Sequence, residues 1–415
     1  MKKVLSILLS VAMIVLCFAA CGKTDGDKSS TGKAANVKVG FIFLHDENST
    51  YDKNFITAAE EACKKAGVEI LKKTNISETQ ACYDAAAELV DEGCNVIFAD
   101  SFGHEPYVIQ AAKKFPEVQF LHATGTKAHT EGLSNYHNAF ASIYEGRYLA
   151  GVAAGMKLNE MISSGKITAD KAKMGYVGAY TYAEVISGYT SFYLCAKSVC
   201  PSVTMEVTFT GSWYDETAEK EAAQKLINNG CVLISQHADS MGAPTACEAA
   251  GVPNVSYNGS TVSACPNTFI VSSRIDWAPY LEYAIDCVKN GKAIDTDWTG
   301  TLSTGSVVLT DVNTKAAAEG TQAKIDEVKA ELESGKLHVF DTSAFTVTVS
   351  DSKNKNATVD ADGHLTGYKA DIDSDADNTG DTEVVSDGYF HESEKRSAPC
   401  FDVQIDGITL LDTKF

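Results

Sequence analysis

The feature that most constrains the fold of this chain is an internal duplication. Residues 85–101 (AAAELVDEGCNVIFADS) and 221–240 (EAAQKLINNGCVLISQHADS) share an Ala- and Leu-containing helical segment, a Gly-Cys pair, an apolar strand and an Asp-Ser pair. Each copy is followed by a helix and a further strand, at 118–125 in the first and at 252–259 in the second. A repeated order of this kind indicates two structural units of the same design.

Each unit also begins with a strand that leads through a loop into a helix. Residues 37–44 precede a helix around 55–66, and residues 172–180 precede a helix around 184–198. Alternating strands and helices with continuous Val, Ile and Phe runs predict parallel sheets covered on both faces. We therefore predict the α/β class, with two doubly wound parallel-sheet lobes. Ligands bind at the carboxyl ends of the strands in such sheets, so a ligand cleft is expected between the lobes.

The N-terminus has the layout of a secretory signal. Lys2 and Lys3 precede an apolar run that ends at Phe18, and two alanines stand directly before Cys21. The run is shorter than a membrane span requires, and the order resembles a bacterial lipoprotein signal. We predict a signal peptide over 1–20, lipidation of Cys21 and a flexible tether over 21–36. Secretion without a lipid is the alternative.

Charge and cysteine content narrow the classes of partner. The formal net charge is −20 at pH 7 and becomes −22 when Lys2 and Lys3 leave with the signal. Such an acidic chain disfavours nucleic acid and anionic lipid surfaces, so membrane attachment would be covalent. The 12 cysteines show no spacing typical of a metal site, and most lie inside helical or strand patterns. We expect no metal and no cofactor, and we interpret those cysteines as small buried residues.

The loops that follow the predicted strands carry aromatic rings, carboxylates, amides or hydroxyls. This lining is typical of a site for a flat small molecule with a polar edge. The ligand-binding candidates in these loops are Asp46, Tyr51, Ser101, Phe102 and Thr124 in the first half, and Tyr182, Glu184, Trp213, Asp215, His237, Asp239, Asn258, Asp276 and Trp277 in the second.

Some of these candidates have a purely structural alternative. Trp213 is placed to stack on a ligand, although a ring packed between sheet and helix would fit the same pattern, and Phe102 and Trp277 share this ambiguity. Asp215 precedes a helical segment, so it could serve only as the N-cap of that helix. His237 lies far in sequence from the other loop histidines, which disfavours a metal site.

The same loops resemble the basic membrane lipoprotein family of substrate-binding proteins for ABC transporters, a group with purine-nucleoside receptors and Med-like proteins. The similarity covers residues 37 to 345. It rests on YDKNF (51–55), YEGRYLAGVAAG (144–155), KMGYVGAYTYAEVISGYTSFYLCAKSVCPSV (173–203), TGSWYDETAEKEAAQKLI (210–227), QHADS (236–240), IDWAPY (275–280) and GKLHVF (335–340).

The resemblance implies a periplasmic-binding-protein type I fold whose lobes close around a purine base or nucleoside. We further expect a monomeric, non-enzymatic receptor at the extracytoplasmic face of the cell membrane, with ABC permease and ATPase subunits as partners. The contacts that it implies are at Asp46, Asn54, Phe55, Phe102, Trp213, Asp239, Asn258 and Asp276. Ile56 and Asn258 depart from the residues common in nucleoside receptors, which favours a free base or a ligand outside the purines.

We expect lobe 1 to comprise 37–157 and 260–315, lobe 2 to comprise 158–259 and 316–345, and 346–415 to form an acidic extension that docks on a lobe. Asp371, Asp373, Asp375 and Asp377 imitate the first ligands of a calcium loop. However, Ala376 and Thr382 stand where that loop needs Gly and Glu, so a solvated insertion is the favoured interpretation.

Two other functions fit the same loops. One is a nucleoside-acting hydrolase that uses Asp239 or Glu184 with His237 as acid and base. No nucleophile elbow or phosphate-binding loop accompanies these residues in the sequence, which disfavours that class. The other is a ligand-sensing surface lipoprotein that works without a transporter.

Overall fold

The computed structural model describes residues 36–372 and 380–414. The predicted signal peptide, Cys21 and the tether up to residue 35 lie outside the described residues, as do Asp373, Asp375 and Asp377.

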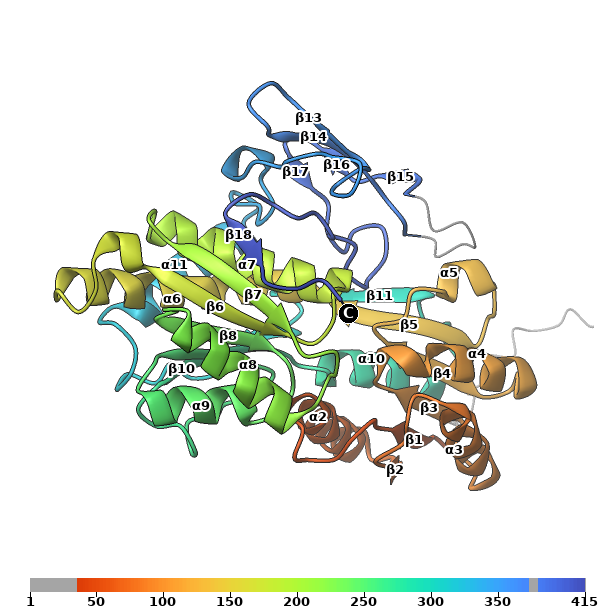
Figure 1. Cartoon of the computed structure of the whole chain (residues 1–415). Coiled ribbons are helices and arrows are strands. Elements are labelled where there is room, and N and C mark those ends of the chain that lie inside the picture. The colour runs from red at the N-terminus through yellow and green to blue at the C-terminus, as the bar shows by residue number, and fades with distance from the viewer. Residues whose placement is uncertain (1–35, 373–379, 415) are drawn as a thin grey trace, which may run out of the picture. The chain divides into compact units, whose positions relative to one another are not determined.

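Six strands form the first sheet, in the order β11-β5-β4-β3-β1-β2, and all neighbours are parallel. The strands are β1 (Lys38–Ile42), β2 (Glu69–Lys73), β3 (Val96–Ala99), β4 (Gln119–Ala123), β5 (Tyr136–Ala141) and β11 (Asp297–Gly300). The helices of this lobe are α2 (Thr50–Ala66), α3 (Gln80–Asp91), η1 (Phe102–His104), α4 (Glu105–Lys114), α5 (Ala128–Glu131) and α10 (Ala278–Lys289) (Figure 1).

Helices cover both faces of this sheet because its strands are apolar on both sides. Val39 and Phe41 of β1 belong to one buried cluster, together with residues of α2 and α10. Ile42 of the same strand belongs to a second cluster with residues of α3 and α4. Alternate side chains of a strand point to opposite faces, so β1 supplies apolar surface to both helical layers.

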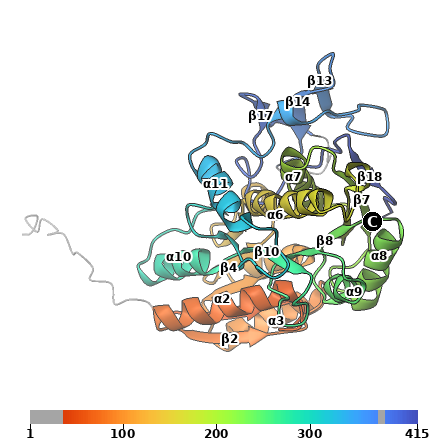
Figure 2. The ribbon, with the colours of Figure 1, turned by 90° about the vertical axis from the view of Figure 1, so that its left-hand side faces the viewer.

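Seven strands form the second sheet, in the order β12-β10-β9-β8-β6-β7-β18. They are β6 (Lys173–Gly178), β7 (Thr204–Phe209), β8 (Leu233–His237), β9 (Asn254–Tyr257), β10 (Phe269–Ile275), β12 (Val307–Leu309) and β18 (Ile408–Leu410). The helices are α6 (Ile143–Ser163), η2 (Ala169–Lys171), α7 (Ala183–Val199), α8 (Glu216–Asn228), α9 (Gly242–Ala250) and α11 (Thr321–Glu333). Helices α6 and α7 pack together, as do α8 and α9, and α11 packs on α6 (Figure 2).

The structure confirms the α/β class and the parallel sheets, but it corrects the expected lobe boundaries. β10 pairs in parallel with β9, and β12 pairs antiparallel with β10, so both strands belong to the second sheet. Only α10 and β11 of the segment 260–315 return to the first sheet. Helix α6 also packs on the second lobe, beside α7 and β10, so the second lobe begins near residue 143.

Three neighbouring segments connect the two lobes. They lie between β5 and α6, between β10 and α10, and between β11 and β12. The Ser142 N–H donates to the Gly300 carbonyl at 2.8 Å, and the Asp276 N–H donates to the Ser306 carbonyl at 2.7 Å. These hydrogen bonds hold the connecting segments side by side, which is the arrangement of a hinge.

The C-terminal part of the chain consists of η3 (Thr342–Ala344) and short strands, followed by β18. The strands are β13 (Ala357–Val359), β14 (Leu365–Ala370), β15 (Thr382–Glu383), β16 (Val385–Ser386) and β17 (Tyr389–Phe390). β13, β14 and β15 form one small sheet, and β16 and β17 form another. β18 joins the edge of the second sheet by pairing in parallel with β7.

Two further properties bear on the sequence-based expectations. The ten cysteines in the described part of the chain are all buried and free of disulfides, as expected of small core residues. Within the ranges that the structure describes, no helix combines the length and the apolar character needed to cross a membrane.

Candidate functional site

A cavity lies between the carboxyl ends of the strands of the two lobes. Its empty space amounts to about 370 Å³, including the solvent at its mouth. Leu44, His45, Tyr51, Asp52, Ser101, Phe102 and Thr124 line it from the first lobe, and Glu184, Trp213, His237, Asp239 and Tyr257 line it from the second.

The structure brings half of the predicted ligand-binding residues into this cavity. They are Tyr51, Ser101, Phe102, Thr124, Glu184, Trp213, His237 and Asp239. Tyr182 lies at the rim, where its ring centroid is 5.2 Å from that of Phe102 on the other lobe. Each of these residues ends a strand, follows one or lies at the start of the next helix, which is why residues far apart in sequence meet at one place.

Aromatic rings form one wall of the cavity. The Trp213 ring lies 5.0 Å from Tyr180 in an edge-on arrangement and 6.0 Å from Tyr182. Tyr180 and Tyr182 stack on each other at 5.0 Å. These contacts hold Trp213 in one orientation while it lines the cavity, so a planar ligand would meet a ring that is already positioned.

Asp52 supplies a carboxylate from the first lobe. It lies in the first turn of α2, where Ser49 caps the helix by accepting a hydrogen bond from the Asp52 N–H at 3.2 Å. Its Oδ1 accepts from the His45 N–H at 2.8 Å, and its Oδ2 lies 3.3 Å from His45 Nδ1. Burial alone would raise the pKa of Asp52, but the hydrogen bonds from His45 and Ser49 outweigh it and lower the pKa. Asp52 is therefore a charged acceptor at neutral pH.

Asp239 supplies a second, chemically different carboxyl group. Burial raises the pKa of Asp239 well above its ordinary range, and the charges of Glu219 and Asp52 add to the effect. Asn258 donates to Asp239 Oδ1 at 3.1 Å. The raised pKa favours the protonated form of Asp239, which can donate a hydrogen bond, whereas Asp52 offers an acceptor.

Glu184 and His237 form a pair on the second lobe. His237 Nε2 lies 3.3 Å from Glu184 Oε1. Burial lowers the pKa of His237, although the hydrogen bond with Glu184 opposes that effect. Behind the pair, Arg147 is fully buried and donates to the Tyr176 hydroxyl at 3.0 Å. The Arg147 guanidinium holds the Tyr176 side chain in place. It also lies 5.1 Å from the ring centroid of Tyr257, a cavity residue.

Contacts across the lobes show that the structure is in a closed arrangement. The Thr50 N–H donates to the Asp239 carbonyl at 3.0 Å. Asn54 donates to the Ile275 carbonyl and accepts from Arg274 at 3.2 Å. These bonds join α2 of the first lobe to strand ends of the second.

The remaining predicted residues do not line the cavity, and each has a physical reason. Phe55 and Trp277 stack on each other at 4.4 Å inside the core, where Trp277 is 1% exposed. Asp46 accepts hydrogen bonds from Asn48 within its own turn. Asp215 caps α8 by accepting from the Ala218 N–H at 2.9 Å.

The other three predicted residues serve the contacts between and behind the lobes. Asn54 makes the cross-lobe bonds described above, and Asn258 supports Asp239 from behind. Asp276 accepts from the Ala278 N–H at 3.0 Å and pairs with Arg274 at 3.5 Å. These residues shape the site without facing the cavity.

The predicted set lacks four cavity residues, namely Leu44, His45, Asp52 and Tyr257. Leu44, His45 and Asp52 flank the predicted Asp46 and Tyr51 in the same loop, so the loop was identified while the orientation of its side chains was not. Tyr257 is the last residue of β9, one position before the predicted Asn258. The position of a residue at the end of a strand was the signal that could have found it.

Comparisons with known proteins agree with this geometry. Residues 40–337 match the family described as "Bmp: ABC transporter substrate-binding protein PnrA-like". The chain is 30% identical to the purine-binding protein BAB2_0673 of Brucella abortus over 73% of its own length and 83% of that protein. It is 26% identical to the putative ABC transporter glucose-binding protein TsgA13 of Haloferax volcanii over 78% of each chain.

A solved structure has the same fold. An ABC transporter solute-binding protein from Conexibacter woesei superposes with a TM-score of 0.59 at 20% identity, covering 73% of this chain and 98% of the other.

Proposed function

Because the chain belongs to the Bmp family of PnrA-like ABC transporter substrate-binding proteins, we propose that it reversibly binds a purine nucleobase or nucleoside for an ABC importer. The observation that carries the proposal is the cavity itself, in which Trp213 stands on one lobe and Asp52 on the other. A purine offers a flat face for the ring and donors and acceptors along its edge for Asp52 and Asp239. The name of the Brucella relative supports the same ligand class.

The closed arrangement of the lobes supports a transport receptor. Closure adds contacts from the second lobe to a ligand that first meets one lobe, so it traps the ligand reversibly. We expect the ligand to leave chemically unchanged. The Glu184 and His237 pair makes hydrolysis the activity to test against, because the two side chains lie 3.3 Å apart. Incubation with nucleosides and chromatography of the products should return no free base.

Membrane attachment through Cys21 is a second part of the proposal. It rests on the lipoprotein-like order of residues 2–22, in which lysines, an apolar run and two alanines precede a Cys-Gly pair. A lipid-anchored receptor at the extracytoplasmic face would deliver its ligand to permease and ATPase subunits. Mass spectrometry of the mature chain should find acyl chains on an N-terminal Cys21, and the Cys21→Ser chain should lack them.

A thermal-shift screen tests the ligand class. Nucleobases, nucleosides, glucose and amino acids are added separately to the purified chain. A ligand at a hundredfold excess over its Kd stabilises the fold by about 2.7 kcal/mol. Purines should raise Tm. A rise with glucose alone would show that the ligand is a sugar and not a purine.

A further inference from the structure

Residues 346–414 lie beyond the part of the chain that matches the family, which ends at residue 337. The Conexibacter structure is covered over 98% of its length by 73% of this chain, so the two-lobed body does not need an extension of this size. Within the extension, residues 392–401 touch both lobes, and we call this segment the strap.

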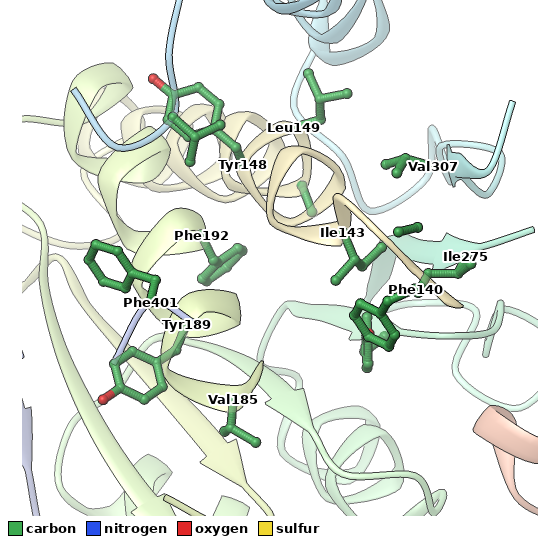
Figure 3. Close-up of a cluster of buried hydrophobic side chains, with 14 of the residues drawn as sticks. Phe140, Ile143, Tyr148, Leu149, Val185, Tyr189, Phe192, Ile275, Val307 and Phe401 are labelled. Carbon is green, nitrogen blue, oxygen red and sulfur yellow. The ribbon is translucent and has the colours of Figure 1, made fainter. Parts of the chain in front are cut away.

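The extension is anchored on the second lobe. β18 pairs with β7, and Asp412 accepts from the Thr208 hydroxyl at 2.6 Å. Gly407 has a φ of +90°, and a Cβ there would lie 2.4 Å from the Tyr193 hydroxyl of α7, so the backbone approaches α7 as only glycine allows. Phe401, at the end of the strap, lies in one buried cluster with Phe192 of α7 (Figure 3).

A buried carboxylate holds the strap in shape. Glu392 is 1% exposed, and its Oε2 accepts from the Cys400 N–H at 3.0 Å and the Phe401 N–H at 2.8 Å. This clamp joins the two ends of the strap and closes the residues between them into a loop. Ser393 and Ser397 in that loop are themselves buried. The strap is therefore a structured loop whose two ends are held together.

The middle of the strap binds the first lobe at β11. The Ser397 N–H donates to Asp297 Oδ2 at 2.9 Å, and the Thr299 hydroxyl donates to the Ser393 carbonyl at 3.3 Å. β11 ends at Gly300, beside one of the three segments that connect the lobes. The strap thus adds a fourth connection next to the hinge.

The strap also borders the route to the cavity. A groove is lined on one side by Arg396, Ala398, Pro399 and Cys400, and on the other by residues of both lobes. Phe102, Thr124 and Glu184 line this groove and the cavity alike. Movement of the lobes against the strap therefore changes the space directly outside the cavity.

From these contacts we infer that the strap restrains opening of the two lobes and keeps the ligand-free protein in more closed arrangements. Rotation of the first lobe has to break the bonds to Asp297 and Thr299 or bend the anchored extension. A neutral hydrogen bond shifts an equilibrium by about two- to tenfold, and a bond to a carboxylate by more. Loss of both contacts should raise the open population of the ligand-free chain by roughly tenfold or more.

The test measures the distance between the lobes in the full ligand-free chain. Spin labels are placed on cysteines that replace the exposed Lys64 of α2 and Lys220 of α8 in a chain that carries Cys17→Ser and Cys21→Ser, since the ten cysteines of the described residues are buried. Asp297→Ala with Thr299→Val removes both strap contacts. His129→Ala is the matched control, because Asp297 also pairs with His129 at 3.5 Å.

The double variant should show a larger population at long distances, and the control should match the parent chain. Thr299→Val alone keeps a β-branched residue in the strand and should give a smaller shift, so it carries the test if the double variant is unstable. Distance distributions that stay unchanged in the folded variants would overturn the inference. The measurement needs no ligand, so it succeeds or fails independently of the proposed purine specificity.

Discussion

At the scale of single residues, Glu219 joins structure to the binding site. Its carboxylate is fully buried in α8 and accepts hydrogen bonds from the Asp215 N–H at 3.1 Å and the Ser240 N–H at 3.2 Å. It therefore ties the start of α8 to the loop that carries Asp239. Burial raises the pKa of Glu219 to about 7, from an ordinary value of 4.5.

This shift predicts a pH dependence of stability. Between pH 4.5 and 7 the folded chain keeps a proton on Glu219 that the unfolded chain has released. The contribution of this group to the free energy of unfolding therefore falls as pH rises through that window, by on the order of 3 kcal/mol. Urea unfolding at pH 5 and pH 7.5 measures the change. Between these two values the free energy of unfolding should fall less in Glu219→Gln than in the parent chain.

Glu216→Gln, on an exposed position of the same helix, is the control and should behave like the parent chain. If the free energy of unfolding falls equally in Glu219→Gln and in the parent chain, Glu219 is not the source of this pH dependence.

Trp213 carries the prediction for ligand affinity. Its ring lines the cavity, whereas Trp277 lies in the core. Ring contacts contribute about 0.5–1.5 kcal/mol beyond the burial of apolar area, so Trp213→Ala should weaken purine binding by well over tenfold. Trp213→Phe keeps an aromatic ring, so its affinity for the purine should fall less than that of Trp213→Ala. Calorimetric titration measures both, with Trp298→Phe as a control away from the cavity. Equal affinities in Trp213→Ala and the parent chain would show that the Trp213 ring does not contact the ligand.

The sequence predicted which loops border the cavity, but it did not predict which side chains of those loops point into it. Trp213 and Trp277 both follow strands, yet only Trp213 lines the cavity. Trp277 precedes a helix that packs against α2, so its ring turns into the core beside Phe55. Tertiary packing decides between these outcomes, and a single sequence does not record it.

At the scale of elements, α6 and α7 meet at two glycines of α6. A Cβ on Gly151 would lie 2.4 Å from the Phe192 carbonyl oxygen, and one on Gly155 would lie 2.6 Å from the Val199 Cβ. The contact at Gly151 is the shorter one and is made with a backbone atom, so Gly151 is the more restricted position. Its role is to let the two helices of the second lobe approach closely.

Gly151→Ala should therefore destabilise the fold by about 1–3 kcal/mol through overpacking, although alanine is the better helix former. Thermal and urea unfolding measure the change. Gly165→Ala is not a useful control because Gly165 has a positive φ of 74°. Ser163→Ala, on the last residue of α6, should stay within about 0.5 kcal/mol of the parent chain. A Gly151→Ala chain as stable as its parent would contradict the close packing.

Most elements could be predicted from sequence, because strand and helix patterns repeat. Gly67, Gly93 and Gly230 follow helical segments in the sequence, and their positive φ values of 64°, 88° and 89° are those of glycines that end helices. Local patterns are less reliable at the start of α3, where Ser77 and Gln80 form a capping-box pattern in the sequence but Thr79 is the N-cap. The sheet to which β10 belongs was not predictable, because membership depends on where the chain crosses between lobes.

At the scale of the whole molecule, the proposed function depends on one cavity shared by two lobes. The duplicated pattern predicted the lobes and the edge at which they meet. It did not predict that Thr50 and Asn54 would bind the second lobe directly, since cross-lobe contacts form only in the closed arrangement. The strap likewise depends on contacts of residues 392–401 that no local pattern reveals.

Calorimetric titration of the full chain with a purine nucleobase, its nucleoside and glucose tests the central claim most directly. The protein should show saturable one-site binding of at least one purine, and no heat of binding for glucose. Binding of glucose with no response to either purine would contradict it.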